Sequence, residues 1–377
     1  METIENNKST VSFVSQSKDW FDGKAVDELM RVSQLPGMRR AVGFPDMHSG
    51  MDTPNGAAFL SEGVFYPHLI GNDIGCGYHL AQTDIRKRKQ KLDRWTKRLA
   101  DLDQPWNGDV QTWLTQRGLA STEFDASMGT IGGGNHFAEL QEVHRVESKA
   151  AFAKAGLDSD KLFVLVHSGS RGLGQRILRS HVDAHRADGL RVGTKDAEAY
   201  ESQHDHAVCW ARANRGLIAE RFASQINARL TPVLDLPHNC MQFVIEEGRQ
   251  YWLHRKGATA TGRGLAVIPG SRGAFTYLVW PLKNSVEHLW SIAHGAGRKW
   301  DRGSTEARMR DYYRKQSLVQ TELGGRVICE DKSLLYQEAP LAYKNIEKVI
   351  EQLVADGLIE VVATLRPLIT YKKRSKQ

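Results

Sequence analysis

The stretch LFVLVHSGSRG, residues 162–172, joins a strand-like segment to a loop of the kind that surrounds active sites. Residues 162–166 form a short, continuous apolar run, which predicts a buried β-strand. His167 follows this run, and the small residues at 168–170 leave its imidazole unshielded and the backbone N–H groups accessible. A histidine in this setting is well placed to ligate a metal or to attack a phosphorus atom.

On both sides of this stretch the sequence predicts further strands and helices. Further apolar runs predict strands at residues 242–245, 251–253, 265–268, 275–279 and 359–365. Helical patterns predict a basic amphipathic helix over 84–103, a long helical stretch over 195–230 broken near Arg215-Gly216, and a helix over 343–355.

The order of these segments is not a repeating βαβ chain. We therefore expect an α+β fold in which residues 1–377 form one large domain, with mixed sheets and surrounding helices. Length alone also allows two or three domains.

The composition is that of an ordinary globular protein. With 41% hydrophobic and 25% charged residues, it excludes a collagen, a coiled coil and a disordered chain. No apolar run approaches the roughly 18 residues of a membrane span, so we expect no membrane partner. Four cysteines without a Cys-x-x-Cys pair favour a reducing cytoplasm. The net charge of +7 makes a polyanionic partner plausible without identifying it.

Five more segments set a possible ligand beside small, flexible backbone. They are PDMHSG at 45–50, NDIGCG at 72–77, GTIGGGNHF at 129–137, PHN at 237–239 and AHGAGR at 293–298. Any one of them is explained as well by a tight turn as by a site. Their recurrence in one chain favours a site.

The candidate metal ligands combine oxygen, sulfur and nitrogen donors. Asp73 and Cys76 lie within one turn, and His136, His167 and His238 complete a set suited to one or two divalent transition metals. Ligand softness alone would favour zinc over manganese, so it does not identify the ion. Cys76 could instead be a small buried apolar residue, but its glycine neighbours argue against that.

His294 and the basic run at residues 86–89 can each be interpreted in two ways. His294 is as well explained as a further metal ligand as it is as a nucleophile at phosphorus, where Arg298 and Lys299 would stabilise phosphate charge. The basic run Arg86, Lys87, Arg88 and Lys89 either contacts an RNA backbone or forms a solvated helix face.

Taken in order, these motifs resemble the RtcB family of RNA-splicing ligases. The resemblance extends from Pro45 to Lys372 and rests on an ordered set rather than on one short motif. The matching segments are 73–77, 132–137, 167–172, RKGA at 255–258, SIAHGAGR at 291–298, EAPLAYK at 338–344 and LRP at 365–367.

The resemblance implies an enzyme that joins RNA ending in a 3′-phosphate or 2′,3′-cyclic phosphate to RNA with a 5′-hydroxyl end. It implies GTP and two Mn²⁺ ions per site as cofactors. Family members can rely on a small activating protein for turnover, but nothing in this sequence indicates one. By motif position His294 would take GMP, and Asp73, Cys76, His136, His167 and His238 would hold manganese. Arg171 would join the basic run in binding RNA.

The nucleotide-binding set implied by the resemblance is larger. Asn135 would contact a phosphate, and Glu139 and Lys372 would contact the guanine. The full set is Asn135, Glu139, His238, Asn239, Pro269, Gly270, Ser271, His294, Gly295, Ala296, Gly297 and Lys372.

The sequence also departs from the family pattern. Arg272 stands where the family often has Met, and residues 49–56 deviate from the usual glycine-rich segment. These departures, with the short chain, indicate a divergent branch, and they leave open whether its RNA is a tRNA in splicing or another cleaved RNA under repair. Two rival functions are a metal-dependent RNA-end phosphatase or nuclease that needs no GTP, and a non-catalytic RNA-binding module. If the protein were a non-catalytic module, some of the candidate ligands or His294 should have been replaced by other residues, and none has been.

Overall fold

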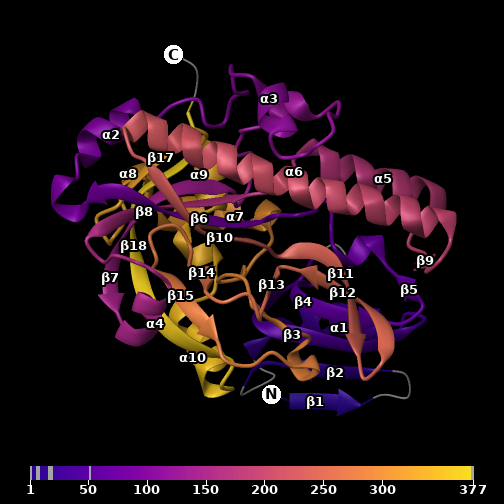
Figure 1. Cartoon of the computed structure of the whole chain (residues 1–377). Coiled ribbons are helices and arrows are strands. Elements are labelled where there is room, and N and C mark those ends of the chain that lie inside the picture. The colour runs from indigo at the N-terminus through magenta and orange to yellow at the C-terminus, as the bar shows by residue number, and fades with distance from the viewer. Residues whose placement is uncertain (1, 6–8, 16–19, 51, 375–377) are drawn as a thin grey trace.

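The computed structural model describes residues 2–5, 9–15, 20–50 and 52–374. Its described residues form helices together with two large mixed sheets, which confirms the α+β prediction (Figure 1). Whether residues 1–377 form one domain stays a prediction. None of the helices formed by the described residues combines the length and apolar composition that crossing a lipid bilayer requires.

The eight-stranded sheet contains the apolar run at residues 162–166 in one of its inner strands, β8. Its order is β10-β6-β8-β7-β18-β15-β14, and β17 pairs with β18 as the parallel exception in an otherwise antiparallel sheet. The strands are β6 (Gly77–Arg86), β7 (Phe137–Val146), β8 (Lys161–Ser168), β10 (Leu230–Pro237), β14 (Ala266–Pro269), β15 (Thr276–Pro281), β17 (Arg326–Cys329) and β18 (Ile359–Lys373).

Strand β8 is apolar throughout because both faces of this sheet are covered. Leu162 and Val164 pack against helix α6 (Lys195–Ile226), while Phe163 and Leu165 pack with strands β15 and β18 on the other side. This explains why its sequence is a continuous apolar run rather than an alternating one.

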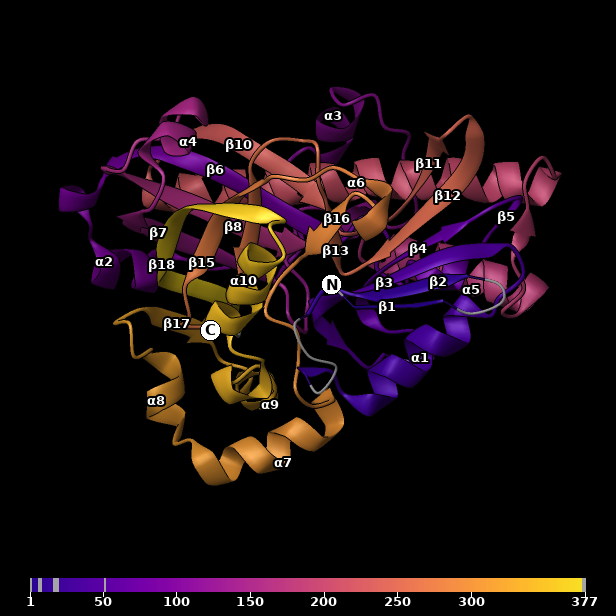
Figure 2. The same cartoon turned by 90° about the horizontal axis from the view of Figure 1, so that it is seen from below.

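The six-stranded sheet has the order β1-β2-β3-β4-β12-β11, with β2 and β3 parallel. Helix α1 (Gly23–Ser33) packs against β3 (Figure 2). The strands are β1 (Glu2–Glu5), β2 (Thr10–Phe13), β3 (Met38–His48), β4 (Asn55–Ser61), β11 (Asn239–Glu246) and β12 (Arg249–Lys256). Two small pairs complete the sheets: β5 (Val64–Phe65) with β9 (Leu190–Arg191), and β13 (Ala258–Ala260) with β16 (Ser291–Ala293).

Helix α6 runs across the whole molecule and contacts strands of both large sheets (Figure 1). The predicted break near Arg215-Gly216 is wrong, because α6 is continuous up to Ile226 and ends at the left-handed Asn227. The interior of the helix is fixed by packing: Arg215 is fully buried and bonded on several sides, which outweighs the weak helix preference of Gly216.

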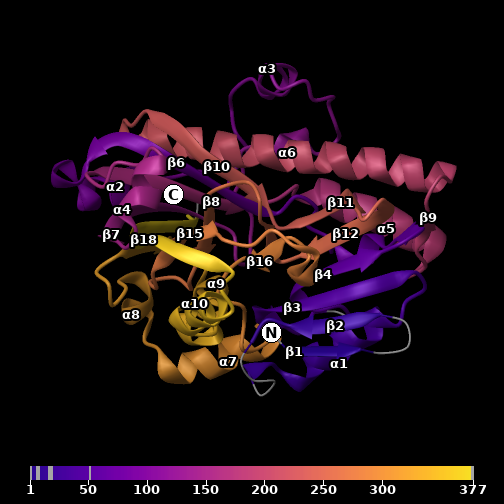
Figure 3. The same ribbon diagram turned by 60° about the horizontal axis from the view of Figure 1, so that its bottom comes forward.

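The remaining helices surround the sheets. α3 stands on a loop beyond α6 (Figure 3), and α7, α8 and α9 lie together near β17 (Figure 2). They are α2 (Leu92–Arg98), α3 (Val110–Thr115), α4 (Lys149–Lys154), α5 (Gly172–His185), α7 (Arg302–Tyr312), α8 (Lys315–Val319), α9 (Lys332–Gln337) and α10 (Ile346–Ala355).

The predicted basic helix over 84–103 is wrong in extent. Strand β6 continues to Arg86, a 3-10 turn follows at Lys87–Lys89, and only Leu92–Arg98 is helical. Pairing with β8 and a backbone hydrogen bond from Asp84 to Arg229 O hold the first part extended, so sheet pairing overrides helix propensity.

The other predicted segments exist with shifted bounds. The helix over 343–355 is α10, which begins after its cap Asn345. The strand over 359–365 is β18, which continues to Lys373 because Pro367 lies at a register shift, where a missing N–H is tolerated.

Candidate active site

The metal-ligand candidates converge because their segments meet at the same end of neighbouring strands in the eight-stranded sheet. Cys76 precedes β6, His136 precedes β7, and His167 lies near the end of β8. These three strands are neighbours, and Phe137 and Tyr78 both pair with His167. His238 follows β10, whose Pro237 pairs with Gly77. Sheet register therefore assembles residues that are distant in the sequence.

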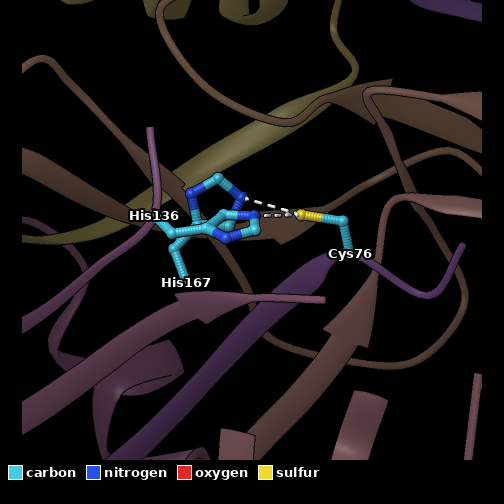
Figure 4. A group of neighbouring side chains, drawn as sticks. All are labelled: Cys76, His136 and His167. Carbon is cyan, nitrogen blue, oxygen red and sulfur yellow. Dashed lines mark hydrogen bonds between the residues drawn. The ribbon is translucent and has the colours of Figure 1, made fainter. Parts of the chain in front are cut away.

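The sulfur and nitrogen donors are close enough to share one cation. Cys76 Sγ lies 3.3 Å from His136 Nε2 and 3.2 Å from His167 Nε2 (Figure 4). His167 Nε2 is in turn 3.3 Å from His238 Nε2. Asp73 Oδ2 lies 2.9 Å from His136 Nε2, and its other oxygen is buried without a hydrogen-bond partner among the residues that the structure describes. All five predicted ligands are thus brought together.

Two of the histidines have Nδ1 beside a backbone carbonyl. His136 Nδ1 is 3.1 Å from Ile131 O, and His167 Nδ1 is 3.3 Å from Asn135 O. A carbonyl oxygen only accepts, so His167 carries its proton on Nδ1 and presents the Nε2 lone pair to the centre. His136 faces an acceptor at both nitrogens, Ile131 O at Nδ1 and Asp73 Oδ2 at Nε2, so a cation bound between Nε2 and Asp73 would favour the same tautomer.

The electrostatics of the cluster suit a cation. Burial lowers the pKa of His167 and of His238 well below the usual histidine range, so both are neutral and ready to ligate. Burial also raises the pKa of Cys76, and a bound cation is what would hold it as a thiolate. The convergent donors and the unpartnered Asp73 oxygen therefore fit a metal centre.

His294 lies beside this cluster but is held differently. Its Nδ1 donates to Asp46 Oδ2 at 2.6 Å, and the backbone N–H groups of His294 and Gly295 donate to the same oxygen at 3.1 and 3.3 Å. Asp46 is fully buried, at 0% side-chain exposure, while the His294 side chain is 12% exposed. Because a carboxylate is hydrogen-bonded to Nδ1, Nε2 is the reactive nitrogen of His294. The ring centres of His294 and His238 are 4.6 Å apart.

The role of Asp46 was missed from the sequence. Asp46 belongs to the segment PDMHSG, but its partner His294 is 248 residues away. Nothing in either segment indicates the contact.

A cavity of about 1010 Å³ is lined by the five candidate metal ligands and by His294. It is also lined by the rest of the predicted nucleotide-binding set, namely Asn135, Glu139, Asn239, Pro269, Gly270, Ser271, Gly295, Ala296, Gly297 and Lys372. This volume is in the range of nucleotide-sized ligand sites.

Several of these side chains already have partners. Glu139 accepts hydrogen bonds from Thr370 Oγ1 at 2.6 Å and Gln141 Nε2 at 2.7 Å, and burial raises its pKa. Lys372 Nζ donates to His136 O at 3.1 Å. Asn239 links two loops, because its Oδ1 accepts from Gly257 N and its Nδ2 donates to Asp73 O.

Arg171 is the one member of the predicted RNA-binding set that lines this cavity. The basic run at 86–89 ends strand β6, whose other end adjoins Cys76. At about 3.3 Å per residue the run lies roughly 30 Å from the cluster. Arg86 is 3.6 Å from Asp160 Oδ2, and Lys87 donates to Val143 O. RNA binding by this run stays a prediction.

Arg215 is a second residue that sequence reasoning missed. From α6 its Nη1 donates to Gly75 O at 2.6 Å and Ser168 O at 3.0 Å, and Nη2 pairs with Asp235. It therefore joins the loop of Cys76 to the loop of His167. A buried arginine in a helix interior carries no local sequence signal.

Comparison with known proteins gives a consistent result. The family model described as tRNA-splicing ligase RtcB matches residues 28–105 and 106–373. RNA-splicing ligase RtcB2 of Escherichia coli (strain ATCC 25922) is 48% identical over 370 residues, which cover 97% of this chain and 96% of the relative.

More distant relatives align over similar lengths. tRNA-splicing ligase RtcB of Archaeoglobus fulgidus is 28% identical over an alignment of 438 residues, covering 91% of this chain and 90% of the relative. RNA-splicing ligase RtcB of Escherichia coli K12 is 25% identical over 421 residues, covering 94% and 97%.

Proposed function

The chain belongs to the RtcB family of RNA-splicing ligases, and from that premise we propose that it joins RNA ends through a guanylylated His294. It is an RNA ligase, and RNA is its substrate. The proposal adds GTP, two Mn²⁺ ions and the residues that use them. The observation that carries it is the hydrogen bond between His294 Nδ1 and the buried Asp46, beside the Cys/His cluster.

Asp46 makes His294 a nucleophile in three ways. Its carboxylate fixes the imidazole orientation, keeps the proton on Nδ1 and stabilises the positive charge that the ring gains when Nε2 attacks. His294 Nε2 forms a bond to the α-phosphorus of GTP, the bond to pyrophosphate breaks, and pyrophosphate leaves. Arg298 and Lys299 line the cavity nearby and suit a polyphosphate.

The same site then serves the RNA ends. A 2′,3′-cyclic end is first hydrolysed to a 3′-phosphate. An oxygen of that phosphate attacks the phosphorus held on His294, the P–N bond breaks, and an RNA–GMP anhydride forms. The 5′-hydroxyl of the second RNA attacks the 3′-phosphorus, its proton is lost, and GMP leaves. When held by the five predicted ligands, two Mn²⁺ ions would polarise phosphate oxygens in these steps.

The residues around the cluster contribute positioning. Arg171 and Lys372 supply positive charge on the cavity wall, and Glu139 is suited to accept from the N–H groups of guanine. Bringing two RNA ends into line is largely an entropic task, which a cavity built from distant segments performs.

A guanylylation assay tests the proposal. Wild-type protein with Mn²⁺ and α-labelled GTP is expected to form a covalent, acid-labile adduct, and His294→Ala to form none. His144→Ala is the matched control, since His144 is exposed and stacks on Phe275 away from the cavity. An adduct of equal yield in His294→Ala, or no adduct in wild type, would contradict the mechanism.

A phosphatase or nuclease that needs no GTP is the rival that the donor cluster alone would also support. Joining a 3′-phosphate RNA to a 5′-hydroxyl RNA, with and without GTP, separates the two. Excess RNA over enzyme in the same assay also tests for a small activating protein, since single-turnover joining without multiple turnover would indicate a missing partner.

A further inference from the structure

Lys344 contacts both the segment that carries Asp46 and the loop that carries His294. Its backbone N–H donates to Gly297 O at 3.0 Å, in the loop that follows His294. Its Nζ donates to Pro45 O at 3.0 Å and to Met47 O at 2.7 Å. These carbonyls belong to the residues on either side of Asp46.

The segment around Asp46 needs such support because it leaves its sheet. Strand β3 pairs with β4 at Gly43 with Ala57 and again at His48 with Asn55. Residues 44–47 therefore bulge opposite the single residue 56. Ladder pairing with β4 is interrupted there, so the backbone at Asp46 depends on contacts from outside the sheet.

Residue 56 fits this bulge only as glycine. Gly56 has a φ of +79°, and a Cβ there would come within 2.7 Å of Met47 N. The close packing keeps the bulge against β4. Lys344 donates hydrogen bonds to two carbonyls of the bulge, and Trp20 Nε1 adds a second donor to Pro45 O at 2.6 Å.

The carboxylates of Asp46 and Asp22 favour the charged form of Lys344 from a distance, but neither forms a close ion pair with it. Among the described residues, no acidic oxygen lies within 4 Å of its Nζ, which instead faces the rings of Trp20 and Phe21, each 5.4 Å away. An ammonium between two carbonyls and two ring faces has a fixed position. A lysine used only to fill space would not need this geometry.

We propose that Lys344 is a positioning residue for the nucleophile: it holds the bulge of β3 so that the Asp46 carboxylate meets His294 Nδ1. The inference rests on the proposed role of His294. Asp46 and His294 come from segments that are not neighbours in the chain, so their 2.6 Å contact depends on how the two segments are joined. Lys344 contacts both.

The first readout needs neither GTP nor metal. In ¹⁵N-histidine-labelled protein, the Nδ1 proton bonded to Asp46 is expected as a low-field resonance that His294→Ala and Asp46→Asn remove. Lys344→Met is expected to remove or broaden it, and Lys344→Arg to retain it. Lys348→Met, on the exposed face of α10, is the matched control and is expected to leave it unchanged.

The second readout is the single-turnover guanylylation rate. Lys344→Met is expected to lower it about 10- to 100-fold with the GTP concentration dependence changed less than about twofold, since a displacement near 1 Å costs rates of this order. Lys344→Gln, which still donates one hydrogen bond, is expected to be intermediate and serves if the methionine variant does not fold.

The two readouts distinguish the possible failures. If wild type forms no adduct, the proposed function fails, and the resonance still tests the link from Lys344 to Asp46. If the resonance is unchanged in Lys344→Met and Lys344→Gln, the positioning role is overturned, whatever the rates. It is also overturned if Lys344→Arg behaves like Lys344→Met in both readouts.

Discussion

Asp46 and His294 are 248 residues apart in the chain, and the carboxylate of one fixes the imidazole of the other. Three hydrogen bonds from the loop of His294 end on a single oxygen of Asp46, which is fully buried. This oxygen therefore determines the position of the loop and of the ring together. Removing its charge should affect the chemistry more than nucleotide binding.

We predict that Asp46→Asn lowers the single-turnover guanylylation rate by about 100-fold or more, the size expected when a group that sets proton position is lost. An amide either donates toward Nδ1 or accepts without charge, so the imidazolium formed on attack is no longer stabilised. Rates over a range of GTP concentrations measure this, and the half-saturating GTP concentration should change little.

Asp27→Asn is the matched control, because Asp27 lies on the exposed side of α1 and its loss removes the same charge. A rate for Asp46→Asn within threefold of the control would contradict the role assigned to Asp46.

At this scale the sequence predicted the residues that carry their own motif. Cys76, His136 and His167 each lie beside glycines, and all three reach the cluster. Residues whose role depends on a distant partner were not found. Asp46 and Arg215 contact their partners only in the folded chain, and no local sequence pattern predicts these contacts.

Strands and helices were predicted best where burial alone decides them. The run at residues 162–166 is β8, covered on both faces. Strand β6 extends to Arg86 because Arg86 pairs with Lys161 and the Asp84 N–H donates to Arg229 O, and the local sequence, which predicts a helix from residue 84, shows neither partner. Pairing partners, rather than local propensity, decide such segments.

The contact between α6 and β10 depends on pH. Burial alone would raise the pKa of Asp235, but Arg215 and His79 outweigh it and hold the pKa at about 2, below the ordinary 3.8. The group therefore contributes stability that is present above about pH 4 and is lost as the pH falls through about 2. The full contribution is about 2 kcal/mol.

We predict that Asp235→Asn lowers the free energy of unfolding at pH 7 by about 3–5 kcal/mol, since Arg215 is left buried and unpaired. At pH 3 the difference from wild type should shrink by about 1 kcal/mol, because wild type has begun to lose the ion pair. Urea unfolding at both pH values measures this. Asp311→Asn, an exposed change on α7, should show no such pH dependence, and a difference for Asp235→Asn that grows on acidification would refute the assignment.

For the molecule as a whole, the cluster joins segments that the chain order separates. Its five predicted ligands come from the loops before β6 and β7, the end of β8 and the turn after β10. A cation bound there would cross-link these loops in the folded state only. Binding should therefore appear as stability, independently of any reaction with RNA.

We predict that Mn²⁺ raises the melting temperature of wild type by several degrees. At a concentration 100 times the dissociation constant, a bound ion adds about 2.7 kcal/mol to the free energy of unfolding. His167→Ala should lose most of this shift, because His167 Nε2 contacts both Cys76 Sγ and His238 Nε2. Cys209→Ser should keep it, since Cys209 is exposed on α6. An equal shift in His167→Ala would mean that the ion binds elsewhere, and Zn²⁺ titrated in parallel tests whether the thiolate and imidazole donors prefer the softer ion.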